Sequence, residues 1–251
     1  WIWGYAEAES AGMAPSPALF FSALAQRTTQ IRFSPMAYLL PLYHPLRLIE
    51  EVCMLDHLSQ GRVEVGISRG VSPYEIGCYN VDPETTREIF AETLDIYRAG
   101  MCNEVLEHSG KHYQFHDVPM EMQPLQRPYP PLWYPSFSEA GAAYAAQHGF
   151  NYLCLGPPAL VTQLMAHYDN VAAQHVNDPV RFNGHVATPK RGAMRQIFIA
   201  DTDEAAMAIA KPAYENWYNS ITQLWHRHGD SSYDGFFGWD GCLAGETILI
   251  G

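Results

Sequence analysis

The residues best placed to do chemistry are Ser68 and Arg69, at the end of an alternating segment, and Arg87, 18 residues after Arg69. Apolar and polar residues alternate over 62–68, which predicts a strand whose tip carries a hydroxyl and a guanidinium group. A helix is predicted to begin at Pro83, so Arg87 lies in its first turn, where unpaired backbone N–H groups favour an anion. Two guanidinium groups beside a helix N-terminus predict a bound phosphate.

Each of these residues also has an ordinary structural interpretation. Arg69 could be a structural ion-pair partner, and Arg87 alone could be a solvated helix residue. His108, His112 and His116 recur every four residues, as metal ligands on a helix would. Their context is a predicted hairpin rather than a helix, so we interpret them as solvated loop residues and predict no metal site.

Composition narrows the class of protein. The chain has 251 residues, is 47% hydrophobic and carries a formal net charge of −12, so it can bury a large core and does not fit a nucleic-acid-binding protein. It has no apolar run long enough to span a membrane and no secretion signal at its start. The five cysteines are scattered without a C-x-x-C pair. We therefore expect reduced thiols in a cytoplasmic protein without membrane or nucleic-acid partners.

Strand and helix patterns alternate along most of the chain. A break at 101–130 contains a predicted hairpin, and loops are predicted at 69–82, 175–193 and 229–245. The predicted strands cover 1–5, 31–40, 62–68, 132–136, 152–155, 196–200 and 246–250. The predicted helices cover 18–29, 45–58, 83–100, 137–147, 158–174 and 203–228. This alternation is typical of parallel strands with helices outside them.

Two architectures fit this pattern: an open doubly wound sheet, or a (β/α)8 barrel that lacks a piece at each end. A closed barrel needs eight strands, and the sequence predicts six or seven. The insertion around 101–130 and the abrupt ends of the chain favour the barrel. We expect residues 1–251 to form one α/β domain of this TIM-barrel type.

A family resemblance supports the barrel. The runs Pro41-Leu-Tyr-His-Pro-Leu-Arg47, Leu55-Asp-His-Leu-Ser-Gln-Gly-Arg62 and Gly66-Ile-Ser-Arg-Gly70 resemble the bacterial luciferase-like monooxygenase family, and the similarity continues through Pro128-Tyr-Pro-Pro-Leu-Trp133. These enzymes are flavin-dependent (β/α)8 barrels. By comparison with that family, the chain is expected to lack the first βα unit and the last βα segment.

The resemblance also implies roles for individual residues. Arg69 and Arg87 would bind the phosphate of the flavin, helped by the hydroxyl of Ser138 or Ser136. A non-prolyl cis peptide near the flavin ring is implied between Met36 and Ala37. The implied flavin-binding set is Met36, Ala37, Ser68, Arg69, Arg87, Ser136 and Ser138.

Two residues are the catalytic candidates. Ser68 occupies the position of a reactive cysteine in luciferase, so thiol chemistry is not required here. Glu7 would match the glutamate of a Glu-His-His motif that family members often carry, but no histidine follows it in this chain. This departure puts catalysis in doubt more than flavin binding.

The function implied by the resemblance is a monooxygenase that uses reduced FMN and oxygen on a small apolar, aldehyde-like substrate. A separate reductase would supply the reduced FMN, and a homodimer is expected. One alternative is a deazaflavin-dependent oxidoreductase that transfers hydride on the same fold. Another is a non-catalytic flavin-binding partner subunit. The sequence does not separate these alternatives.

Overall fold

The centre of the structure, a computed structural model that describes residues 16–251, is a parallel sheet of five strands in the order β1-β2-β5-β6-β7. With the β3–β4 hairpin set aside, neighbouring strands follow one another in chain order, without the reversal that a doubly wound sheet requires. The winding is that of a TIM-type barrel, as predicted, although the described strands do not close into a ring. The strands are β1 (Tyr38–Leu39), β2 (Val65–Ser68), β5 (Leu132–Pro135), β6 (Asn151–Leu155) and β7 (Arg191–Met194).

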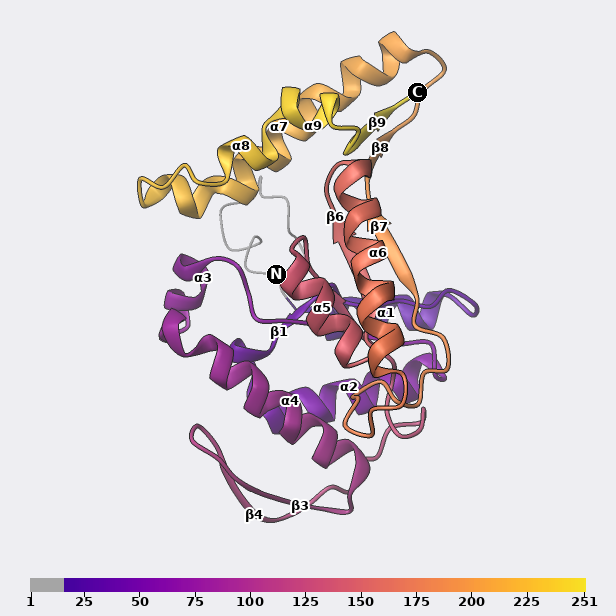
Figure 1. Cartoon of the computed structure of the whole chain (residues 1–251), viewed down its shortest axis with the longest axis vertical. Helices are drawn as coiled ribbons and strands as arrows, with labels where there is room; N and C mark the ends of the chain where they lie inside the picture. The colour runs from indigo at the N-terminus through magenta and orange to yellow at the C-terminus, as the bar shows by residue number, and fades with distance from the viewer. Residues whose placement is uncertain (1–15) are drawn as a thin grey trace.

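Helices follow the strands, and the later ones form a separate group (Figure 1). Helix α7, the short helices α8 and α9, and the parallel pair β8–β9 gather at the top of the view, while the β3–β4 hairpin lies at the opposite end. The helices are α1 (Pro17–Arg27), α2 (Pro45–Ser59), α3 (Pro73–Cys78), α4 (Thr86–Cys102), α5 (Glu139–Gln147), α6 (Pro158–His175), α7 (Asp203–Arg227), α8 (Asp234–Phe237) and α9 (Trp239–Ala244). Short 3-10 turns cover Leu40–Leu42 and Pro83–Thr85, and the remaining strands are β3 (Val105–Ser109), β4 (Gln114–Pro119), β8 (Gln196–Phe198) and β9 (Ile248–Ile250).

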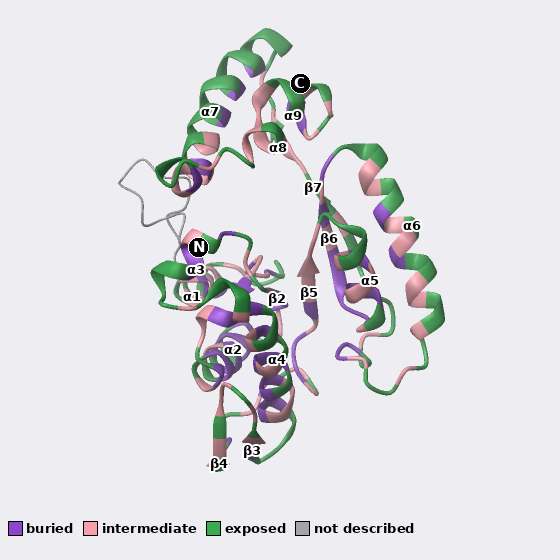
Figure 2. Ribbon diagram, turned by 60° about the vertical axis from the view of Figure 1, so that its left-hand side comes forward, coloured by how far each residue is buried: buried purple, intermediate pink, exposed green. Residues whose placement is uncertain are grey.

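The main core lies between this sheet and helices α2, α4, α5 and α6 (Figure 2). Apolar side chains that recur along α2 and α4 are buried: Leu48, Val52 and Leu55 on α2, and Phe90 and Leu94 on α4. Strand β2 is buried on both faces, because a parallel strand in this fold is covered on each side. The polar side of the alternation at 62–68 therefore faces the protein interior and not solvent.

Several predicted elements were wrong in extent. The strand expected over 31–40 is reduced to a bridge at Phe33 and the two residues of β1, because Pro35 lies between them and has no N–H for a strand ladder. The loops predicted at 69–82 and 229–245 contain α3, α8 and α9, and the loop at 175–193 runs into β7. The predicted hairpin at 105–118 is confirmed as β3–β4.

Helix α1, predicted over 18–29, leaves part of its apolar surface exposed. Leu19 is 75% exposed and Phe20 is 51% exposed, whereas Ala25 is buried. Phe21, one helical turn before Ala25, stacks on Phe33 with ring centroids 5.2 Å apart. Hydrophobicity marked a face of this short helix, but contact with the strand below decided which face is covered.

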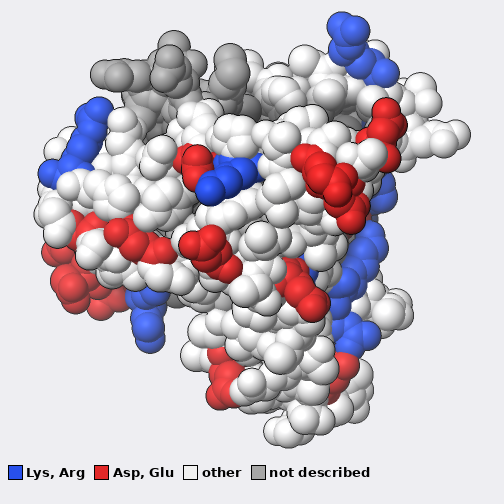
Figure 3. Space-filling model, turned by 90° about the horizontal axis from the view of Figure 1, so that it is seen from above, with Lys and Arg blue, Asp and Glu red and all other residues white. Residues whose placement is uncertain are grey.

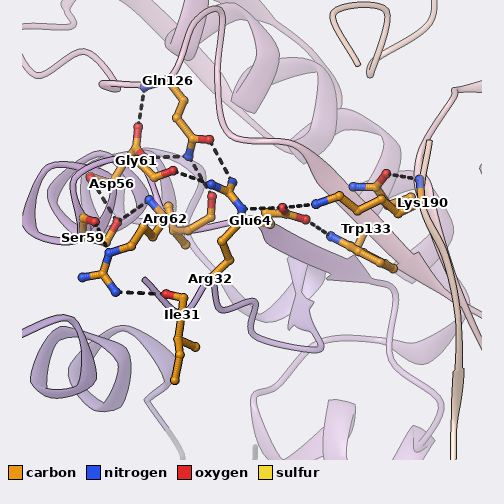
Figure 4. A network of polar contacts seen from close by, with 12 residues as sticks. Ile31, Arg32, Asp56, Ser59, Gly61, Arg62, Glu64, Gln126, Trp133 and Lys190 are labelled. Carbon is orange, nitrogen blue, oxygen red and sulfur yellow. Dashed lines mark hydrogen bonds and ion pairs between the residues drawn. The ribbon is translucent and has the colours of Figure 1, made fainter. Parts of the chain in front are cut away.

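A buried carboxylate joins the amino ends of neighbouring strands (Figure 4). Glu64 accepts hydrogen bonds from Arg32 Nε at 2.8 Å, from Lys190 Nζ at 2.7 Å and from the indole N–H of Trp133. Burial acts to raise the pKa of Glu64, but the hydrogen bonds from Lys190, Trp133 and Arg32 outweigh it and hold that pKa below its ordinary value. This network lies at the opposite edge of the sheet from the strand tips, where its role is to hold strands together.

The histidines of the hairpin contact carboxylates individually. His108 Nε2 lies 3.1 Å from Glu92, and His116 Nδ1 lies 2.9 Å from Glu107.

No helix among residues 16–251 combines the length and apolar composition needed to cross a membrane.

Candidate functional site

A cavity of about 580 Å³ lies where the carboxyl ends of β2 and β5 meet helices α4 and α5. We call it the arginine cavity. Because parallel strands present their carboxyl ends at one edge, residues distant in the sequence converge there. The cavity is lined by Ser68, Arg69, Gly70, Val71, Arg87, Phe90, Ala91, Tyr134, Pro135, Ser136, Phe137, Ser138, Ala140, Gly141, Tyr144 and Tyr233.

Both predicted arginines line this cavity. Arg69 follows the last residue of β2, while Arg87 shares one face of α4 with Phe90 and Ala91, one turn further along. Within residues 16–251 neither guanidinium group forms an ion pair, and the lining contains no aspartate or glutamate. On the face shown in Figure 3, Asp and Glu side chains are interspersed with Lys and Arg. The arginine cavity thus holds uncompensated positive charge in a chain whose net charge is −12.

The N-terminus of α5 completes the polar side of the cavity. Ser138 is the N-cap, and its Oγ accepts a hydrogen bond from Gly141 N at 3.2 Å. Ser136 Oγ accepts one from Ser138 N at 3.2 Å. A Cβ at position 141 would overlap Ser136 Oγ, so only glycine lets the two hydroxyl groups approach the helix start. Further N–H groups in the first turn of α5 have no partner within the helix and can donate to an anion.

An aromatic cluster forms the apolar wall. The ring centroids of Tyr134 and Tyr144 lie 5.2 Å apart, and Phe90 lies 6.1 Å from Tyr134. Burial raises the pKa of Tyr134, and the positive charges of Arg69 and Arg87 oppose that rise. The phenol therefore stays neutral near pH 7 and offers a flat apolar surface with one hydroxyl group. Sequence reasoning missed this wall, although Tyr134 lies next to the proline that ends β5.

Ser68 lies in the cavity wall at the last position of β2. Its Oγ accepts a hydrogen bond from Gly70 N at 3.2 Å, and within residues 16–251 it donates none, so its proton can be donated to a ligand. Gly70 has a φ of +92°, a left-handed conformation that suits glycine and turns the chain back over the strand tip.

Met36 and Ala37 are joined by a cis peptide bond, as the resemblance implied. They do not line the arginine cavity. A Cβ at Gly66 would lie 2.7 Å from Met36 Sδ and would overlap the carbonyl oxygen of Pro35. The segment 35–37 therefore packs directly over the interior face of β2. Glu7 lies outside the described residues.

Tyr233 closes the side of the cavity opposite the strands, and sequence reasoning did not identify it. Its segment is attached to α3, because Tyr74 donates a hydrogen bond to Asp230 Oδ2 at 3.0 Å. The Tyr74 ring also stacks on His228 at 4.3 Å. These contacts join the loop after β2 to the end of α7, more than 150 residues later.

The arrangement suits a flat ligand with an anionic tail. Guanidinium groups, hydroxyl groups and a helix N-terminus bind phosphate oxygens, while the aromatic wall can cover a ring system. Within residues 16–251, no group of three or more His, Cys, Asp or Glu side chains is placed to hold a metal ion.

Known proteins resemble this chain in sequence and in fold. The family model described as luciferase-like monooxygenase matches residues 2–235. The oxygenase component of a flavin-dependent trigonelline monooxygenase from Acinetobacter baylyi is 30% identical over 83% of this chain and 57% of its own length. The chain spans about six-tenths of the length of curated relatives that match most of it.

Two solved structures share the fold. The monooxygenase RslO1 from Streptomyces bottropensis superposes with a TM-score of 0.80 at 24% identity, covering 96% of this chain and 70% of that one. The oxygenating constituent of 3,6-diketocamphane monooxygenase from Pseudomonas putida, solved in complex with FMN, gives a TM-score of 0.70 at 20% identity, covering 94% and 71%.

Proposed function

This chain belongs to the luciferase-like monooxygenase family, and we propose that it binds FMN in the arginine cavity and uses the reduced flavin with oxygen to oxygenate a small apolar substrate. The observation that carries the proposal is that Arg69 and Arg87 line one cavity and that, among the described residues, neither has a carboxylate partner there.

The residues present fit the phosphate end of FMN. A phosphate carries about two negative charges near neutral pH, and two arginines with the N-terminus of α5 supply positive charge and several N–H donors. Serine hydroxyl groups at 136 and 138 add donors at the same end of the cavity. Because no described residue of the lining is acidic, none of them repels the anion.

The chain's own contribution is binding, orientation and exclusion of water. Arg69 and Arg87 would hold the phosphate, and Phe90, Tyr134 and Tyr144 would supply the apolar surface of a water-poor site. Ser68, whose hydroxyl donates no hydrogen bond within the described residues, is proposed to donate one inside the cavity. When bound, the flavin supplies the redox chemistry. A separate reductase as the source of reduced FMN, and a homodimer, are part of the same proposal.

Reoxidation of flavin tests the function. Chemically reduced FMN is mixed with oxygen and excess protein, and the return of oxidised-flavin absorbance is followed. With the unmodified chain, we expect oxidised-flavin absorbance to return more slowly than with free FMN, because the site excludes water. With an Arg69→Ala, Arg87→Ala double variant, we expect it to return at the rate of free FMN. If the protein binds FMN but leaves the reoxidation rate unchanged, a non-catalytic flavin carrier is favoured.

The deazaflavin alternative is separated by binding. We expect FMN to bind more tightly than the deazaflavin in matched absorbance titrations. Tight binding of the deazaflavin without measurable binding of FMN would replace the oxygenase with a hydride-transfer enzyme.

A further inference from the structure

A second cavity, of about 200 Å³, lies next to the arginine cavity, and the proposed function does not use it. It is enclosed by the end of β6, by the chain from β7 to β8, by α7 and by the segment that carries α8 and α9. We call it the apolar cavity. Its lining residues are Leu155, Gly156, Pro157, Met194, Gln196, Tyr214, Trp217, Gly235, Phe236, Phe237, Gly241, Cys242, Thr247 and Ile248.

The lining of the apolar cavity carries no ionisable acid or base apart from Tyr214 and Cys242. Tyr214 already donates its hydroxyl hydrogen bond to the carbonyl of Phe237 at 2.9 Å, and burial raises its pKa. Thr247 Oγ1 likewise donates to the carbonyl of Cys242 at 2.8 Å. These polar groups are satisfied by the protein itself, so they leave an apolar surface.

Gln196 is different. It lines the apolar cavity from β8, and its side-chain amide makes no hydrogen bond within residues 16–251. An amide can donate to a carbonyl or hydroxyl oxygen and accept from a hydroxyl group. The cavity therefore pairs an aromatic enclosure with one polar group that a ligand can use.

The two cavities share a wall. Tyr233 lines the arginine cavity, and Phe236 and Phe237 line the apolar cavity. Phe137 of the arginine cavity lies 5.1 Å, centroid to centroid, from Phe236, and Tyr233 stacks on Phe237 at 5.7 Å. A ligand in the apolar cavity would therefore be separated from the arginine cavity by Phe137, Tyr233 and the two rings that they contact.

We propose that the apolar cavity is a second ligand site, and that its ligand is a neutral single-ring compound with one carbonyl or hydroxyl group for Gln196. An apolar cavity of about 150 Å³ takes up benzene, so about 200 Å³ fits one ring with a small substituent. A carboxylate is excluded, because burying an unpaired charge among aromatic side chains is costly.

Gly235 offers a way to fill the cavity without disturbing the backbone. A Cβ at this position meets no atom within 4 Å, and its φ lies outside the left-handed region. Gly235 lines the cavity and is itself exposed, so Gly235→Leu should place a side chain at the mouth of the cavity. Gly77 of α3 is a matched control, because its Cβ also meets nothing within 4 Å and it lines neither cavity.

The probes are acetophenone, a neutral aryl ketone, and benzoate, a charged compound of similar size. Binding to the full chain without flavin is measured by calorimetry. We expect acetophenone to bind at least tenfold more tightly than benzoate. Gly235→Leu should weaken acetophenone at least tenfold, with FMN affinity unchanged, and Gly77→Leu should leave both affinities unchanged.

Equal binding of the two probes, no binding of acetophenone, or acetophenone binding unaffected by Gly235→Leu would overturn the assignment. If Gly235→Leu does not fold, as judged by circular dichroism, Gly241→Val replaces it, because a Cβ there meets only the Gly235 carbonyl oxygen at 4.0 Å. The same criteria then apply. If the unmodified chain binds acetophenone but does not bind FMN, the result counts against the proposed function and not against the role of this cavity.

Discussion

Removal of either arginine from the arginine cavity should weaken FMN while sparing the fold. A hydrogen bond to a charged group contributes roughly 1.5–3 kcal/mol, and about 1.4 kcal/mol corresponds to a tenfold change in affinity. Arg69→Ala and Arg87→Ala should each raise the dissociation constant of FMN roughly 10- to 100-fold. Because neither guanidinium group is paired with a carboxylate within residues 16–251, unfolding free energy should change by less than about 0.5 kcal/mol.

The assay compares FMN with riboflavin, which has the same ring system and no phosphate. Each ligand is titrated against each variant by quenching of flavin fluorescence. The arginine variants should lose affinity for FMN and keep nearly all of their affinity for riboflavin. Arg47→Ala is the matched control, because Arg47 is exposed on α2, forms an ion pair with Glu50 at 3.0 Å and does not line the arginine cavity. Both flavins should bind this variant as tightly as they bind the unmodified chain.

Two results would refute this reasoning. If riboflavin loses as much affinity as FMN, the arginines act on the ring or on the shape of the cavity instead of the phosphate. If both variants change FMN affinity less than about threefold, which is below the weakest hydrogen bond to a charge expected here, the phosphate lies elsewhere.

Three further predictions concern glycines and the buried carboxylate. Gly141→Ala should weaken FMN at least tenfold in the same titration, because its Cβ displaces Ser136; unchanged affinity would remove Ser136 from the site. Gly66→Ala should lower the unfolding free energy by about 1–3 kcal/mol, because its Cβ overlaps the carbonyl of Pro35; urea denaturation measures it, and a stability within error of the unmodified chain contradicts the packing. Glu64→Gln should cost roughly 1–3 kcal/mol at pH 7. The folded-state pKa of Glu64 is lowered, so its contribution to stability is complete above the ordinary carboxyl pKa and is lost as the pH falls through the lowered value. The difference in unfolding free energy between the variant and the unmodified chain should therefore shrink on acidification. A difference that does not depend on pH would show that the charge of Glu64 does not stabilise the fold.

The placement of the two arginines could be predicted because both depend on local signals. A strand tip follows from alternation over 62–68, and the first turn of a helix follows from the start signals near Pro83. Parallel strands then bring their carboxyl ends to one edge. The cis peptide at Met36 was reached by resemblance alone, since no local pattern in the residues indicates it.

Other features depend on partners far away in the chain. The alternation of the sequence predicts that Glu64 lies on the solvent side of a strand. In the structure it is an interior residue, because Trp133 and Lys190 donate hydrogen bonds to it. Tyr233 carries no recognisable motif, and it reaches the arginine cavity only because the end of α7 is attached to α3.

The amino-acid sequence by itself determined the alternation of strands and helices, the parallel winding and the two cationic residues at one edge, because these depend on periodicity and turn chemistry within short segments. Tertiary structure decided which faces are covered, as with Phe21 in place of Leu19 on α1, and it created both cavities from segments that meet only after folding. The physical reason is that local propensity fixes backbone conformation, whereas burial depends on which surface each segment finds opposite it.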